Sequence, residues 1–294
     1  MASLYTHQDE NVRKTYLLFA AFLVLVGAIG WFFSYLYNNS AIFYGAIFFS
    51  LAMNIASYWF SDRLVVALSR AVPADPSEYR ELHQIVENLA ITAGLPKPKV
   101  YIIEDPAPNA FATGRDKEHA VVAATTGLLS ILTKTELEGV IGHELSHIGN
   151  RDILVSTVAV LLAGCISILA DMFLRSLWWG GGRDRDRGNG ILTVVGILLA
   201  ILAPIFGTLM QLAISRRREF LADASGALLT RYPEGLASAL EKIGQYARPM
   251  LTPSSATAHL FIANPFGPGK RAWTTLFMSH PPIEERIAAL RGQS

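Results

Sequence analysis

Four long apolar runs constrain the fold of this 294-residue chain more than any other feature of its sequence. They cover residues 16–37, 41–60, 153–174 and 191–214, and each is long enough for a helix to cross a bilayer. The first run is too long for a signal peptide and the second follows after only three residues, so together they predict a transmembrane hairpin. Asn54 in the second run can hydrogen-bond to the first, although a single tolerated polar residue explains it equally well.

The charges beside these runs predict on which side of the membrane the rest of the chain lies. Positive side chains precede the first run at 13–14 and follow the second at Arg63 and Arg70, so both ends of the hairpin are expected in the cytoplasm. The second pair of runs conflicts with this rule, because two crossings place four arginines at 175–187 outside. We prefer four full spans, and the alternative is a second hairpin that is buried only partway in the membrane.

Composition agrees with a membrane protein and excludes other classes. Hydrophobic residues make up 51% of the chain. Its net charge is +1, and the sequence has no block of like charge that would predict a nucleic-acid-binding surface. The single cysteine, Cys165, excludes an intramolecular disulfide and a cysteine-based metal cluster.

A five-residue motif, His143-Glu144-Leu-Ser-His147, predicts a metal site. It lies in an expected helix over 135–149, whose start has a capping box formed by Thr133 and Glu136 or by the next such pair. Two histidines four apart share one face of a helix, so both imidazoles can bind one zinc ion. Glu144 then lies beside the metal as a general base for a bound water. The alternative is a helix that carries these residues by chance, which is rare in a chain with seven histidines.

A catalytic zinc requires a third protein ligand and leaves one position open. Glu219 fits, because it lies on a predicted helix just beyond the last apolar run. Asp223, one turn later, can accept a hydrogen bond from the free nitrogen of a ligating histidine. Glu219 taken alone is equally well a solvated acid, but its pairing with Asp223 favours a site for one Zn²⁺ per chain; another divalent metal is not excluded.

The remaining segments predict the fold class, which is mainly α within an α+β arrangement. We expect a helix from Pro76 to about Gly94, strands at 99–104 and 119–124, an edge strand or loop at 109–114, and an irregular flap at 248–280. The chain thus divides into an N-terminal transmembrane hairpin (1–62), the first part of the zinc domain (63–152), a second transmembrane hairpin (153–214) and the second part of the zinc domain with the C-terminal tail (215–294). Four transmembrane helices would carry a small zincin-like domain, made of helices and a short β-sheet, on the cytoplasmic side.

In its motifs and their order, the chain resembles HtpX-type proteases, bacterial membrane zinc metalloproteases of a family that includes the CaaX prenyl endopeptidases. The resemblance covers the opening hairpin, Pro108–Gly114, the metal-binding helix, the later apolar pair, Glu219–Asp223 and Ser279–Arg286. It implies that an edge strand pairs with an extended substrate backbone and that two residues of the tail have catalytic roles, His280 near the metal or the oxyanion and Arg286 tying that loop to the site; simple packing roles for both are equally good. The residues implied for the strand are Asn109, Ala110, Phe111 and Ala112.

The resemblance implies a zinc metalloendopeptidase in the bacterial cytoplasmic (inner) membrane, multi-pass, with its active site facing the cytoplasm. Its expected role is quality control of misfolded or damaged membrane proteins. Expected partners are unfolded or membrane-protein substrates and the bilayer, but not nucleic acid, and cooperation with an ATP-dependent membrane protease is a further expectation. The chain has no phosphate-binding loop, so it does not itself power the unfolding of substrates. The alternatives are CaaX-type peptide processing, against which the small number of spans argues, and a non-catalytic membrane chaperone on the same fold.

Overall fold

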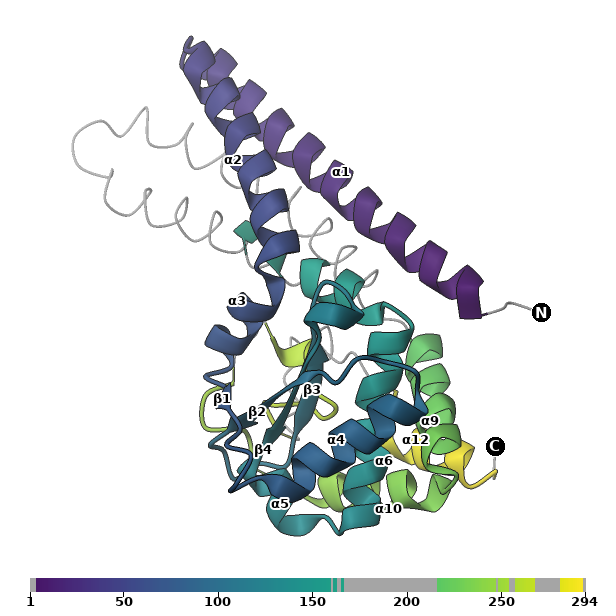
Figure 1. Ribbon diagram of the computed structural model, residues 1–294. Helices are drawn as coiled ribbons and strands as arrows, with labels where there is room; N and C mark the ends of the chain where they lie inside the picture. Colours follow the sequence, from purple (N-terminus) through teal and green to yellow (C-terminus); the bar gives the residue numbers. More distant parts are fainter. Residues whose placement is uncertain are drawn as a thin grey trace.

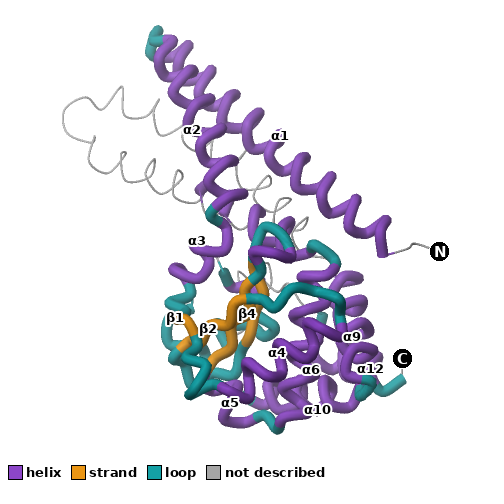
Figure 2. The backbone as a smooth tube through the Cα atoms, viewed as in Figure 1, coloured by secondary structure: helices purple, strands orange, loops and turns teal. Residues whose placement is uncertain are grey.

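The computed structural model describes residues 4–159, 161–162, 165–166, 216–246, 248–253, 257–267 and 281–292. In this part of the chain, a long helical hairpin projects from a globular part that contains a four-stranded sheet (Figure 1). The described residues are mainly helical with one small sheet, as predicted. Helices surround the sheet in the globular part (Figure 2).

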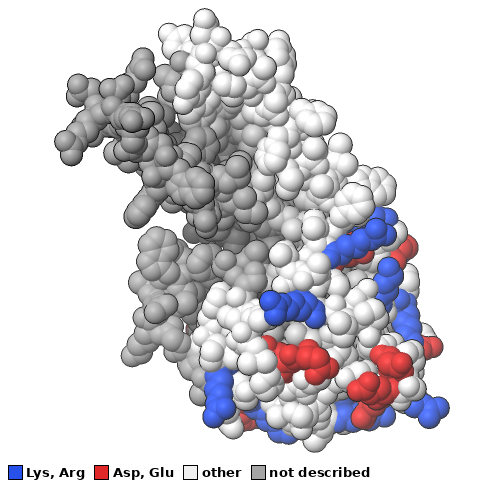
Figure 3. Space-filling model, turned by 90° about the vertical axis from the view of Figure 1, so that its left-hand side faces the viewer, with Lys and Arg blue, Asp and Glu red and all other residues white. Residues whose placement is uncertain are grey.

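The hairpin consists of α1 (Leu4–Leu36) and α2 (Ser40–Trp59). Both helices are long and apolar enough to cross a membrane by length and composition. On the face shown in Figure 3 the described charged side chains gather on the globular part. Asn54 Nδ2 donates to the Phe19 carbonyl oxygen of α1 at 3.2 Å, so of the two alternatives for this residue the structure has the hydrogen bond between the two runs.

The start of the third apolar run packs against α1. Residues 152–159 are helical, and Leu154, Val155 and Val158 are buried against Leu18 and Phe22. The rest of this run and the whole fourth run lie outside the described residues. The second hairpin therefore stays a prediction.

The sheet has the strand order β1-β2-β4-β3, with β3 at one edge. Its strands are β1 (Val72–Pro73), β2 (Lys99–Ile103), β3 (Ala110–Thr113) and β4 (Val121–Thr125). β2 and β4 are parallel, whereas β3 and β1 pair antiparallel with their neighbours. The predicted strand at 119–124 begins later, because residues 117–119 form a short 3₁₀ helix capped by the Asp116 side chain. The segment predicted as an edge strand or loop is an edge strand.

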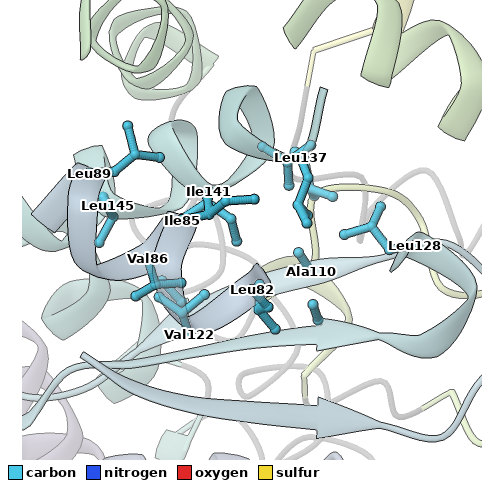
Figure 4. Packing of buried hydrophobic residues seen from close by; sticks show 14 of the residues in the cluster. Leu82, Ile85, Val86, Leu89, Ala110, Val122, Leu128, Leu137, Ile141 and Leu145 are labelled. Atoms are coloured by element: carbon cyan, nitrogen blue, oxygen red, sulfur yellow. The ribbon is translucent and has the colours of Figure 1, made fainter. Parts of the chain in front are cut away.

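Helices α4 (Arg80–Thr92) and α6 (Lys134–Gly149) pack over one face of the sheet (Figure 4). The expected start of the first helix at Pro76 was wrong, because the Asp75 carboxylate accepts the Ser77 backbone N–H at 2.7 Å and forms a turn there. The core between these layers contains Leu82, Ile85, Val86, Leu89, Ala110, Val122, Leu128, Leu137, Ile141 and Leu145. This packing holds α6 rigidly beside the edge strand.

The remaining helices complete the globular part. They are α3 (Ser61–Leu68), α5 (Thr126–Ile131), α9 (Arg216–Thr230), α10 (Pro233–Gln245), α12 (Ile283–Leu290) and the 3₁₀ helix at Ala258–Leu260. The backbones of α9 and α6 are in direct contact, since a Cβ added to Gly226 of α9 would be 2.7 Å from the backbone nitrogen of His143. No side chain larger than hydrogen fits at Gly226 unless the two helices separate.

The start of α6 is anchored to α10 through Glu136. The predicted capping box forms, with the Glu136 carboxylate accepting the Thr133 backbone N–H at 2.7 Å. The same carboxylate accepts from Ser238 Oγ at 2.6 Å and from Lys242 Nζ at 2.7 Å. Burial opposes ionisation, but these hydrogen bonds, led by the one from Lys242, lower the pKa of Glu136 to about 2.

Candidate active site

Helices α6 and α9 bring three candidate metal ligands together. His143 and His147 project from the same face of α6, with their Nε2 atoms 3.2 Å apart. Glu219 on α9 places its two carboxylate oxygens 3.6 Å and 3.7 Å from these nitrogens. The ligand atoms of all three residues lie within 4.8 Å of one another, which is the spacing that one metal ion needs.

The second nitrogen of each histidine is held by a buried carboxylate. His143 Nδ1 lies 2.9 Å from Asp223 Oδ1, and His147 Nδ1 lies 3.1 Å from Asp152 Oδ2. A hydrogen bond at Nδ1 fixes the tautomer that leaves Nε2 free for a metal. The structure therefore places Asp223 where the sequence predicted it, and it adds Asp152, which sequence reasoning missed.

Asp152 was hard to find because no periodic pattern points to it. It follows the end of α6 by three residues, beyond a turn in which Arg151 has a φ of 57°. This left-handed residue reverses the chain and brings Asp152 back beside His147. A carboxylate just after the break of a metal-binding helix was the only available signal.

Arg286 lies behind His143. Its side chain is completely buried, and its Nε and Nη2 atoms donate to Asp223 at 2.8 Å and 2.6 Å. Asp223 thus accepts a paired hydrogen bond from Arg286 while it orients His143. Arg286 reaches the candidate ligands through Asp223, and its Nη2 atom also lies 3.4 Å from His143 Nδ1. His280, the other predicted tail residue, lies outside the described residues.

Glu144 is buried beside the ligands with 2% exposure. Burial raises the pKa of its carboxyl to about 7, and the charge of Glu219 adds to this, while a backbone hydrogen bond from Ala112 opposes it. A carboxyl whose pKa is close to neutral can both accept and release a proton. This is the property required of a general base that later acts as an acid.

The two histidines differ in the protein without a metal. Burial lowers the pKa of His143 to about 4. Burial acts in the same direction on His147, but the nearby charges of Glu219 and Asp152 outweigh it and raise its pKa to about 9. At neutral pH a cation must therefore displace a proton from His147, so metal binding is expected to release a proton.

The outer edge of β3, predicted to bind substrate, is partly occupied by the chain itself. Ala110 accepts the Ile262 backbone N–H at 2.9 Å. The Asn109 side chain makes two hydrogen bonds to Ala263, the residue after Ile262. It accepts the Ala263 backbone N–H at 3.1 Å and donates to the Ala263 carbonyl oxygen at 2.9 Å. We call residues 257–263 the edge segment. Phe111 packs against Phe261 of this segment, with ring centroids 5.1 Å apart, and Ala112 lies beside Glu144.

Comparison with known proteins shows where this arrangement belongs. Residues 76–294 match Peptidase family M48. The chain belongs to this family. The M48 chain is 52% identical to a protein named Protease HtpX homolog from Caldanaerobacter subterraneus subsp. tengcongensis, over 98% of this chain and 97% of the relative. A second Protease HtpX homolog, from Pyrococcus furiosus, is 50% identical over 95% and 94% of the two chains.

The fold of this M48 chain is similar to that of a solved structure, the crystal structure of S. mikatae Ste24p. The TM-score is 0.51 at 17% identity, and the likeness covers 97% of this chain and 67% of the other. The family match and the two relatives confirm the predicted resemblance to HtpX-type proteases, and the chain is a metalloendopeptidase with two helices long and apolar enough to cross a membrane.

The family implies a metal cofactor, and the donor set fits one. Two imidazole nitrogens and a carboxylate converge, and a buried carboxylate holds the remote nitrogen of each imidazole. Three protein donors leave a further position for water or substrate, as a catalytic site requires. The M48 chain thus has three candidate ligands, two of them oriented by carboxylates, and an adjacent buried carboxyl group that can act as a base.

Proposed function

We propose that this chain is an integral-membrane zinc metalloendopeptidase that hydrolyses peptide bonds of misfolded or damaged membrane proteins. The observation that carries the proposal is the convergence of His143, His147 and Glu219 beside the buried Glu144. Two imidazoles and a carboxylate favour zinc over magnesium or calcium, which prefer ligand sets made of oxygen atoms.

Each residue has a defined part in hydrolysis. Zinc held by the three ligands would supply Lewis acidity toward the attacking water and the scissile carbonyl. Glu144 takes a proton from that water and then passes it to the leaving amine, and its burial beside the ligands places it for both transfers. Asp223 holds His143 in orientation, and Arg286 holds Asp223. Peptide and water are consumed and two new chain ends are formed, with no covalent intermediate on the protein.

Substrate binding by strand addition explains a preference for unfolded segments. The backbone of Asn109–Ala112 lies at the edge of the sheet, and pairing with main chain reads few side chains. Only an extended, flexible segment can pair in this way. Because Ile262 and Ala263 already bond to Ala110 and Asn109, substrate has to displace the edge segment or bind beyond it.

The proposed location is the cytoplasmic (inner) membrane, multi-pass, with the active site on the cytoplasmic side. The two apolar helices of the hairpin support it, as do the positive side chains that follow α2 at Arg63 and Arg70. Labelling with an impermeant maleimide tests it in a chain whose Cys165 is replaced by serine. The maleimide should label the Tyr37→Cys variant in intact cells and the Lys134→Cys variant only after lysis. The reverse pattern would contradict this topology.

The enzymatic proposal is tested by comparing the wild type with Glu144→Gln, both purified in the same detergent. Bound metal is measured, and cleavage is followed on an unfolded soluble protein and on a membrane protein with an unfolded loop. We expect about one zinc in each and cleavage by the wild type alone. Equal cleavage by both would remove Glu144 from its role, and binding without cleavage by the wild type would favour the chaperone alternative.

A further inference from the structure

One hydrogen bond connects the surroundings of the candidate metal ligands to the helical hairpin, which lies outside the globular part. Asp152, 3% exposed, uses Oδ2 to bond His147 and uses Oδ1 to accept from Asn11 Nδ2 at 2.7 Å. Asn11 belongs to α1, the first helix of the hairpin, and lies 141 residues earlier in the chain. A membrane helix is therefore two hydrogen bonds away from a candidate metal ligand.

Asn11 is held in one orientation. It is 3% exposed, and its Nδ2 atom donates both to Asp152 and to the Asn150 carbonyl oxygen at 3.1 Å. An amide nitrogen has two hydrogens, so these two bonds use its full donor capacity. Thr15 Oγ1 donates to the Asn11 carbonyl oxygen at 3.0 Å, which is a bond within α1.

The carboxylate of Asp152 has a second charged neighbour. Arg218 Nε on α9 lies 3.8 Å from Oδ1, the oxygen that also accepts from Asn11. Oδ2 faces His147, so the two oxygens have different partners. Because Asn11 and Arg218 both engage Oδ1, they oppose rotation of the carboxylate away from the imidazole.

The two ligating histidines are thus supported from different sides. His143 is supported within the globular part, by Asp223 of α9 and Arg286 of α12. His147 is supported by Asp152, whose other oxygen is bonded by the hairpin. In both histidines a carboxylate bonds Nδ1, but only the carboxylate at His147 is itself hydrogen-bonded by α1.

We propose that Asp152 and Asn11 are positioning residues of the metal site, through which α1 holds His147 in its ligating orientation. The inference rests on the proposed function, because it takes His147 as a metal ligand. Asp152 acts on His147 directly and Asn11 acts on Asp152. The hairpin is then a structural component of the metal site as well as an anchor.

The test uses the full-length protein in detergent and measures zinc affinity by competition with a chromophoric chelator. Asp152→Asn, which keeps the side-chain shape, should lower zinc affinity about 10- to 100-fold. Asn11→Ala should lower it about threefold or more, since it loosens Asp152 without removing it. Asn54→Ala is the matched control, because Asn54 also bonds α1 by its side chain but contacts none of the ligands, and its affinity should stay within about twofold of wild type.

A mutant cycle separates positioning from general loss of structure. In an Asp152→Ala background, adding Asn11→Ala should change zinc affinity by no more than about twofold, because the residue it acts on is gone. The thermal midpoint of each metal-free variant is measured in parallel, and the absorption bands of bound Co²⁺ report the ligand geometry. A changed Co²⁺ spectrum in Asp152→Asn with an unchanged metal-free midpoint supports positioning.

Two results overturn the inference. Wild-type zinc affinity in Asp152→Asn would show that Asp152 does not position the ligand, and equal affinities in Asn11→Ala and Asn54→Ala would show that α1 takes no part. His147→Ala distinguishes this from failure of the proposed function. If His147→Ala loses zinc while Asp152→Asn does not, the inference alone is wrong, whereas wild-type affinity in His147→Ala would refute the ligand assignment itself.

Discussion

Replacing Glu136 by glutamine should weaken the attachment of α6 to α10 by an amount that depends on pH. The carboxylate accepts hydrogen bonds from Thr133, Ser238 and Lys242, and its pKa is about 2 in the folded protein, against 4.5 for the unperturbed group. This difference corresponds to about 3 kcal/mol in the free energy of unfolding. Glutamine keeps the shape of the side chain but cannot carry the charge.

The sign follows from a folded-state pKa that lies below the unfolded value. The stabilisation by Glu136 is fully present above pH 4.5 and is lost as the pH falls through about 2. The wild type should therefore exceed Glu136→Gln by about 3 kcal/mol at pH 7 and by only about 1 kcal/mol at pH 3. In urea the first difference equals a shift of about 1 to 2 M in the unfolding midpoint.

Urea unfolding of both proteins in one detergent, followed by circular dichroism from pH 7 to pH 3, measures this directly. Glu138→Gln is the control, because Glu138 lies on the same helix and is only partly buried. Its midpoint should follow that of the wild type across the range. Parallel curves for wild type and Glu136→Gln would refute the reasoning, since the ionised carboxylate would then contribute nothing.

Three further predictions concern the site. Arg286→Met should lower the free energy of unfolding by about 3 to 5 kcal/mol, because it leaves the buried Asp223 without its paired partner; a loss below about 1 kcal/mol in thermal unfolding would contradict this. Ile262→Pro removes the N–H that Ala110 accepts, so kcat/KM for an unfolded protein should rise about two- to fivefold, and an unchanged value would show that substrate does not use this oxygen. Removal of the metal with a chelator should abolish cleavage, and stoichiometric zinc should restore it; cleavage that survives metal depletion would exclude a metal-dependent mechanism.

The sequence predicted the elements whose patterns are local. The capping box at Thr133 and Glu136 and the end of the metal-binding helix at Gly149 both rest on residues a few positions apart, and the structure has each of them. Glu219 was predicted as a ligand because catalytic zinc chemistry requires a third one, and Asp223 was predicted beside the site because helical spacing relates it to Glu219.

Contacts between distant segments were not predictable in this way. Asp152 and Asn11 meet across 141 residues, and nothing in the sequence near either residue requires the other. The edge segment is similar, because its hydrogen bond to β3 uses backbone groups that every residue except proline possesses. The helix expected from Pro76 starts at Arg80, since the Asp75 side chain bonds the backbone locally and competes with the first helical turn.

The bare backbone contact between α6 and α9 also fixes how closely the three candidate ligand residues converge. Gly226 lets α9, and with it Glu219, lie close to the two histidines. A Cβ at Gly226 would lie 2.7 Å from the backbone nitrogen of His143. Zinc bonds to nitrogen and oxygen are about 2.0 to 2.2 Å, whereas calcium bonds are about 2.3 to 2.6 Å and more numerous. An alanine at Gly226 would move α9 outward and enlarge the ligand triangle toward the larger ion. Gly226 therefore sets the spacing of the three candidate ligand residues, although it has no side chain of its own.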